Sequence, residues 1–384
     1  MKLLHRHLFT SMALTCLAAV GLFVFVLMLG NVIRDMLGYA LSGQIEPGLF
    51  IRLVALTSVA MSTYALPLGV LAGVLLVLGR MSSDREITAM RSAGLSLARI
   101  ATPVVIFALL GVAAAVAINF YFMPRAKVTY EAELADAVRQ NPLSFIVPKT
   151  FIRDFPGTIV YVNDKQGALL KDVWIWKLDR QKRVRTLVHA QSGRIDYDEA
   201  NNRLLVTLRR FTSQEFDHKN PEDLTTAPLV GTMEKFSDVL PLDNLFGQRT
   251  LRQKLQWMTF NELRAEWNRI KAQRAATPEE STQLELQRMK VQITIHEKFT
   301  TAFSVLSFAL IGIPLGLKVS RKETSANLGI ALALAMAYYF LTIAVGWLDQ
   351  HPSLRPDLLM WAPNFIFQAL GCCLIWRVDR SSGG

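Results

Sequence analysis

The sequence predicts an α-helical membrane protein with an all-β domain inserted between its third and fourth spans. Hydrophobic residues make up 51% of the 384 residues and charged residues only 19%, a more apolar balance than soluble domains have. The apolar residues form six long segments without any Asp, Glu, Lys or Arg. Between the third and fourth segments lies a long polar region with short runs of β-branched and aromatic residues, which are typical of strands.

Each uncharged segment has about the 17 to 25 residues that a helix needs to cross a hydrocarbon core. Helices are expected because lipid offers no hydrogen-bond partners to the backbone. The first segment follows two basic residues, as in a signal peptide, but it is too long for a signal sequence and no cleavage site follows, so we expect an uncleaved span. The six predicted spans are 8–33, 53–79, 100–123, 299–317, 325–348 and 358–376.

The distribution of Lys and Arg predicts the orientation, because short cytoplasmic loops are enriched in both. With the N-terminus inside, the short outer loops carry only Arg34, Arg52 and Arg355. Both termini are therefore expected in the cytoplasm, and most of the net charge of +11 follows from this bias rather than from a nucleic-acid surface. The inner segments carry Lys2, Arg6, Arg80, Arg85, Arg91, Arg99, Lys318, Arg321, Lys322, Arg377 and Arg380.

The chain is thus expected to divide into spans one to three (1–123), an outer domain (124–298) and spans four to six (299–384). The outer domain should begin with an amphipathic helix at 126–140 and end with helices at 259–273 and 279–299, the last running into span four. Between them, short strands separated by turns such as Asn163-Asp164 predict an antiparallel sandwich or roll. The predicted strands are 158–162, 172–178, 185–198 and 203–216.

Few residues of the outer domain indicate chemistry. Trp174 and Trp176 alternate with Val173 and Ile175, so they are either lipid-binding aromatics or, more often, packing residues. The histidines are scattered and all three cysteines fall within spans, which leaves no disulfide framework or thiolate metal site in this domain. The chain has no P-loop, zinc-protease or serine-hydrolase motif, and no acidic residue within its spans. It is therefore not expected to be an enzyme, to bind a cofactor or to be driven by protons.

One charged stretch interrupts the apolar pattern, "GRMSSDREITAMRSAGLS" (79–96), between spans two and three. Ser83 and Glu86 have the spacing of a capping box, and Gly94 stands where a helix ends, so we expect a helix of about three turns within 82–94. Two interpretations are open: a solvated connector, or a helix that fits a groove on a cytoplasmic partner. Candidates for that contact are Arg85, Glu86, Ile87, Met90, Arg91 and Gly94.

Three segments resemble the lipopolysaccharide transport permeases of the LptF/LptG family, with features closer to the LptF branch. They are "LPLGVLAGVLLVLGRMSSDREITAMRSAGLS" (66–96), "LSFALIGIPLGLKVSRKETSANLGIALALAMAYYFL" (306–341) and "DLLMWAPNFIFQALG" (357–371). The resemblance covers the whole chain, and it implies a β-jellyroll as the periplasmic domain.

This resemblance implies a subunit of an ABC transporter in the bacterial inner membrane. A second permease (LptG-like or another copy) would pair with it, and a dimeric LptB-like ATPase would bind ATP and Mg²⁺ beneath them. The helix after span two would be the coupling helix, with Glu86 making the central contact with the ATPase. The jellyroll would pass lipopolysaccharide to an LptC/LptA-like periplasmic bridge by pairing of edge strands.

Two arginines are candidates for contact with lipid. Arg34, at the outer end of span one, matches a basic position that the family uses for lipid, and an arginine there suits a phosphate. It could instead be an interfacial residue that Asp35 neutralises. Arg52 is a weaker candidate of the same kind and could be a plain interfacial anchor.

Two rival functions fit the same pattern. A membrane scaffold that displays a β-domain would not need Glu86 for binding to an ATPase. A permease for another lipid or lipoprotein would use the same helix but carry a different cargo.

Overall fold

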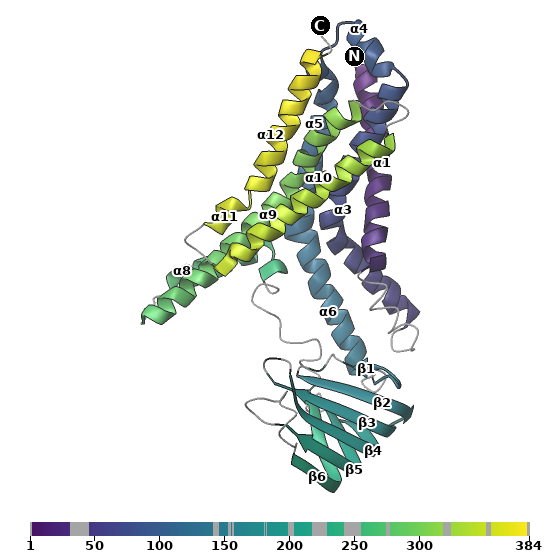
Figure 1. Ribbon diagram of the computed structural model, residues 1–384, viewed down its shortest axis with the longest axis vertical. Helices are drawn as coiled ribbons and strands as arrows, with labels where there is room; N and C mark the ends of the chain where they lie inside the picture. Colours follow the sequence, from purple (N-terminus) through teal and green to yellow (C-terminus); the bar gives the residue numbers. More distant parts are fainter. Residues whose placement is uncertain are drawn as a thin grey trace. The chain divides into compact units, whose positions relative to one another are not determined.

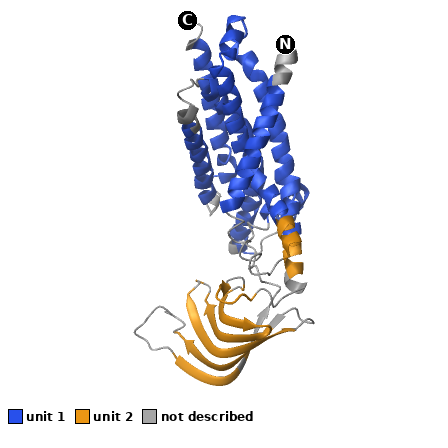
Figure 2. Cartoon of the chain, turned by 90° about the vertical axis from the view of Figure 1, so that its right-hand side faces the viewer, with its two compact units in different colours: residues 1–34, 54–130, 251–384 blue, residues 35–53, 131–250 orange. Residues whose placement is uncertain are grey.

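The computed structural model describes most of the chain and divides it into two compact units (Figures 1 and 2). Unit 1 comprises residues 1–34, 54–130 and 251–384, and unit 2 comprises residues 35–53 and 131–250. The described residues are 2–30, 46–140, 146–152, 155, 157–179, 181, 183–198, 203–216, 229–241, 255–273, 277–317, 324–350 and 355–381.

The six predicted spans are confirmed as six helices that are long and apolar enough to cross a membrane. The third span continues through a π-helical turn, η2 (Ile118–Phe122), into α6 (Met123–Gln140), and short elements η5 (Trp347–Gln350) and α11 (Pro356–Leu359) join the last two spans. The spans themselves are α1 (Lys2–Met28), α3 (Pro47–Ser83), α5 (Leu97–Ala117), α9 (Pro278–Leu317), α10 (Thr324–Gly346) and α12 (Ala362–Ser381).

Helix α9 is the centre of unit 1, since it packs against α5, α10 and α12 (Figure 1). It also packs against α8 (Phe260–Ala272), which begins with a capping box between Thr259 and Glu262. The helix predicted at 279–299 does run without a break into the fourth span.

Two glycines on α3 allow α1 to approach closely. A Cβ atom added at Gly69 would lie 2.8 Å from the Cα of Val20, and one added at Gly73 would lie 2.9 Å from the Cα of Cys16. Since real Cβ atoms do not approach other atoms this closely, these positions accept only glycine without a backbone shift. The spacing of four residues is the small-xxx-small pattern of close helix pairs in membranes.

A buried polar network joins α9, α10 and α12 through Asn364, whose side chain is 1% exposed. Its amide nitrogen donates to the carbonyl of Thr300 (2.9 Å), while its oxygen accepts from the hydroxyls of Ser307 (2.8 Å) and Tyr338 (3.1 Å). Asn364 belongs to the Trp-Ala-Pro-Asn motif of the last span, and Trp361 of that motif donates to His296 Nδ1 (2.9 Å). The motif therefore holds helices together.

A buried lysine stabilises the middle of α9, two residues before Thr300. Lys298 is 7% exposed, and its ammonium donates to the carbonyls of Asn119 and Met258, each at 2.9 Å. The side-chain amide of Asn119 donates in turn to the carbonyl of Lys298 (2.9 Å). Because Asn119 lies in η2, these bonds satisfy backbone carbonyls where the helix departs from α geometry.

Unit 2 contains one antiparallel sheet in which every described strand pairs with the next along the chain, so the predicted all-β insertion is confirmed. Its described strands follow one another as a meander in a single curved sheet (Figure 2). The sequence did not predict the two outermost strands. The strands are β1 (Phe151–Ile152), β2 (Thr158–Gln166), β3 (Leu169–Leu178), β4 (Val184–Asp198), β5 (Arg203–Glu215) and β6 (Leu229–Pro241).

The turn predicted at Asn163-Asp164 is wrong, because β2 continues through both residues and the chain turns at Gly167 instead. Gly167 has φ +61°, a left-handed conformation that glycine adopts without steric strain, whereas Asn163 and Asp164 remain within strand β2, where Asp164 pairs with Lys171 of β3. Local turn propensity was therefore overridden by the pairing of β2 with β3, which extends to Lys165 and Gln166.

The alternation predicted for β3 is confirmed. Val173 and Ile175 are buried in the core on one face of the sheet, at 0% and 1% exposure. Trp174 and Trp176 lie half-buried on the other face, where the two rings stack on each other and Trp174 also stacks on His189. His189 and the Trp174 indole both hydrogen-bond to Asp172, at 2.8 and 3.0 Å. These contacts favour packing as the role of the tryptophans.

Candidate functional site

The charged stretch between α3 and α5 forms a separate short helix, α4 (Glu86–Ser92). The predicted capping box is wrong, because Ser83 is still the last residue of α3. The residue that precedes α4 is Arg85, in a left-handed conformation with φ 60°, and no side chain caps the helix. The helix of about three turns expected within 82–94 is therefore seven residues long, since α3 extends further than its apolar pattern predicts.

The end of α4 matches the prediction. Gly94 has φ +82°, its N–H donates to the carbonyl of Arg91 (2.9 Å), and the N–H of Leu95 donates to the carbonyl of Met90 (3.2 Å). These two bonds define a Schellman motif, which requires a residue with positive φ and so favours glycine. The turn ends α4 sharply and leads into α5, whose first amides are capped by Ser96.

The apolar face of α4 points into the bundle. Ile87 is 7% exposed and belongs to the hydrophobic core that α1, α3, α5 and α9 share, and Met90 packs against that core. Ile87 is thus occupied by the core of the chain itself, while Met90 stays half-buried, and contact of either side chain with a partner stays a prediction. The exposed face instead carries Arg85, Glu86 and Thr88.

One polar contact holds α4 on the bundle, and a second joins the preceding end of α3 to α9. The Arg91 guanidinium forms an ion pair with Asp379 near the end of α12 (3.6 Å) and also donates to the Asp379 carbonyl (3.4 Å). The hydroxyl of Ser82, on the last turn of α3, donates to the carbonyl of Leu317 at the end of α9 (2.9 Å). A partly exposed ion pair contributes little free energy, but this one connects α4 to the end of α12. No sequence pattern indicated a role for Asp379 or Ser82, because their partners lie far away in the chain.

A hollow of about 680 Å³ lies beside α4. It is walled by residues of α4 and its C-terminal turn on one side and by the ends of α9 and α12 on the other. Its lining combines Ile87, Thr88 and Arg91 with Leu97, Leu317 and Val378. The first turns of α1 and the last turns of α12 lie at the same end of unit 1 as α4 (Figure 1).

The two arginines predicted to contact lipid have different outcomes. Arg34 lies outside the described residues. Arg52 belongs to unit 2, where its side chain is 69% exposed and its guanidinium lies 3.5 Å from the carboxylate of Glu133. An ion pair with so exposed an arginine contributes little free energy, and contact of Arg52 with lipid stays a prediction. Among the described residues, no group of three His, Cys, Asp or Glu side chains is placed to hold a metal ion.

Comparison with known proteins agrees with this architecture. The sequence profile described as "Lipopolysaccharide export system permease LptF/LptG" matches residues 6–377. The chain is 23% identical over 375 residues to the lipopolysaccharide export system permease protein LptF of Escherichia coli K12, covering 97% of this chain and 94% of that protein. The proteins of the same name from E. coli O157:H7 and Shigella flexneri match at the same identity and coverage. The chain is therefore a member of the LptF/LptG family of lipopolysaccharide export permeases.

Proposed function

We propose that this chain is a permease subunit that extracts lipopolysaccharide from the outer leaflet of the inner membrane and passes it to a periplasmic bridge. Energy would come from a separate LptB-like ATPase dimer that binds ATP and Mg²⁺. A second permease, LptG-like or another copy of this chain, would complete the transporter. The observation that carries the proposal is α4, a short helix with an exposed Glu86 and a buried apolar face, in a chain of this family.

The packing of α4 suits transmission of movement. A nucleotide-driven closure of the ATPase can displace a spanning helix only through an element that does not yield. Burial of Ile87 and the Arg91–Asp379 contact connect α4 to the core and to α12, and the Ser82 hydrogen bond joins the adjacent end of α3 to α9. A force on Glu86 would thus reach several spans together. In this proposal both termini and α4 are cytoplasmic, and unit 2 is periplasmic.

The sheet offers edges for the transfer step. Strand β6 pairs with β5 on one side and has no other described neighbour in the sheet. Its side chains Leu229, Val230 and Met233 are 81%, 58% and 61% exposed. An edge strand with exposed apolar side chains suits addition of a further strand from an LptC/LptA-like bridge protein.

A test of the proposal compares Glu86→Lys with a matched control, Asp84→Lys. Both residues are acidic and exposed, but Asp84 lies in the turn before α4. The full chain is purified with its partner subunits and reconstituted in proteoliposomes. We expect Glu86→Lys to abolish co-purification of the ATPase or lipopolysaccharide-stimulated ATP turnover, and Asp84→Lys to retain both.

Two outcomes would contradict the proposal. If Glu86→Ala and Glu86→Lys leave ATPase association and turnover intact, the chain acts as a scaffold rather than a driven permease. If a photo-reactive group beside Arg34 crosslinks another lipid but never lipopolysaccharide, the cargo is different.

A further inference from the structure

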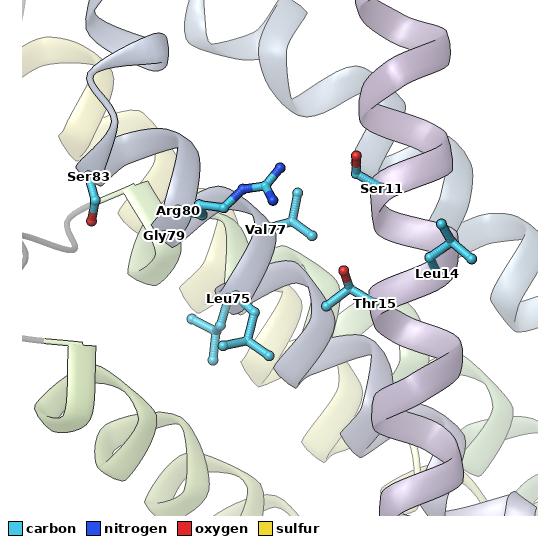
Figure 3. A pocket seen from close by; sticks show the side chains of 9 residues that line it. Ser11, Leu14, Thr15, Leu75, Val77, Gly79, Arg80 and Ser83 are labelled. Carbon is cyan, nitrogen blue, oxygen red and sulfur yellow. The ribbon is translucent and has the colours of Figure 1, made fainter.

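A cleft of about 600 Å³ separates α1 from α3 near the end of α3 (Figure 3). Helix α1 contributes Ser11, Leu14 and Thr15, and α3 contributes Leu76, Arg80 and Ser83. The cleft lies on the surface of the bundle, since Leu14 is 70% exposed and Leu76 is 50% exposed. It is distinct from the hollow beside α4 described above.

The cleft exists because α1 and α3 touch further along and then diverge. At Gly69 and Gly73 the two helices approach so closely that no Cβ fits between them. One to two turns later, α3 carries Leu76 and Arg80 instead of glycine, and α1 lies too far away to cover them. The shape follows from the close contact at Gly69 and Gly73, beyond which the two helices separate.

The chemistry of the cleft is that of a site for an anion with an apolar tail. The exposed Arg80 side chain extends from α3 toward α1, on which Ser11 and Thr15 present hydroxyls to the cleft (Figure 3). Among the described residues, no acidic side chain lies within ion-pair distance of Arg80. A guanidinium can bind a phosphate with two parallel hydrogen bonds, and nearby hydroxyls can donate to its other oxygens.

The walls of the cleft fit the rest of such a molecule. Leu14 and Leu76 flank the opening and continue into the apolar surfaces of α1 and α3. An acyl chain lying against them would remain in the hydrocarbon layer while its headgroup phosphate reaches Arg80. A free phosphate ion would leave these apolar walls without a partner.

We propose that this cleft binds one acidic phospholipid from the leaflet that surrounds the α4 end of the bundle. Arg80 holds the phosphate, Ser11 and Thr15 donate to it, and Leu14 and Leu76 contact an acyl chain. The bound lipid fills the space between α1 and α3 where they diverge. This site differs from any site for the exported lipid, because it does not depend on Arg34 or Arg52.

The test measures lipid binding to the full chain, purified with its co-purifying subunits, by native mass spectrometry. Phosphatidylglycerol and phosphatidylcholine with identical acyl chains serve as the probes. We expect a preference for phosphatidylglycerol that falls about tenfold in Arg80→Gln, in line with loss of hydrogen bonds to a charged group. Arg80→Lys should keep part of the preference, because it keeps the charge and loses the planar guanidinium.

A matched control is Arg99→Gln, since Arg99 is an exposed arginine on the first turn of α5 and does not line the cleft. The proposal is overturned if both glutamine variants lose the preference equally, which would indicate general surface charge. It is also overturned if the two lipids bind equally to the unaltered chain. A third result would also overturn it. If the cysteine of the Leu14→Cys variant forms a disulfide with a second permease subunit, a helix of that subunit occupies the cleft instead of a lipid.

Discussion

Replacement of Asn364 by leucine tests whether the buried polar network holds the last three spans together. Leucine has the same number and branching of side-chain heavy atoms but can make none of the three hydrogen bonds to Thr300, Ser307 and Tyr338. Because Asn364 is 1% exposed, no water or lipid headgroup replaces these partners. We therefore expect the variant to fold with a lower free energy of unfolding.

The expected magnitude follows from the number of bonds. Hydrogen bonds between membrane helices contribute about 0.6 kcal/mol each on average, and at most about 1.7 kcal/mol. Loss of all three lowers the free energy of unfolding by about 2 kcal/mol, which reduces the ratio of folded to unfolded protein about thirtyfold. The loss stays moderate because Tyr338 keeps the Thr300 carbonyl (3.4 Å) and Ser307 keeps Gln368 (3.2 Å) as partners.

The assay is reversible unfolding of the full chain in mixed micelles as the fraction of dodecyl sulfate rises, followed by circular dichroism. Tyr338→Phe should lower the free energy of unfolding by about 0.6 kcal/mol, and the double variant should lose less than the sum of the two single losses, because both changes remove the bond between Tyr338 and Asn364. Thr102→Val removes only a bond to Ala98 within α5 and serves as the control. A change below about 0.5 kcal/mol in Asn364→Leu would refute the reasoning, since it is within the ordinary scatter of such measurements.

Three further predictions follow from single contacts. Gly73→Leu should separate α1 from α3 and lower the midpoint of thermal unfolding, whereas Gly21→Leu, which has open space around its Cβ position, should leave the midpoint unchanged in the same melting experiment. Ile87→Ala should lower the free energy of unfolding by about 2 to 5 kcal/mol, because it leaves a cavity under α4, and micelle unfolding again measures it. Hydrogen bonds from the backbone and side chain of Arg183 and the backbone of Gln181 hold the pKa of Asp179 below its usual range. The turn between β3 and β4 should thus lose stability as the pH falls through that lowered pKa, and an acid titration of Asp179→Asn should show less of this loss.

The fold class could be predicted from the sequence because its signals are local. A membrane span is recognised from a window of about 20 apolar residues, whatever surrounds it. The alternation of Val173 and Ile175 with two tryptophans likewise predicted that the two pairs lie on opposite faces of β3. Gly94 predicted the end of α4, since only a few residues adopt the backbone conformation that this turn requires.

The candidate site could be located from the sequence but not built from it. The charged stretch in 79–96 marked the correct segment, and Glu86 is exposed there. The predicted capping box was wrong because Ser83 is the last residue of α3, which continues beyond its apolar segment. Ile87 was predicted to contact a partner protein, but the hydrophobic core of the chain itself already buries this side chain.

The sequence by itself thus determined the spans, the inserted sheet and the position of the helix that ends in Gly94, because each depends on neighbours in the chain. Only the tertiary structure decided which face of α4 is free, and that Arg91 meets Asp379 across 288 residues of chain. It also decided that Asn364 joins three helices. Such pairings depend on how helices cross, and no local pattern of residues specifies a crossing.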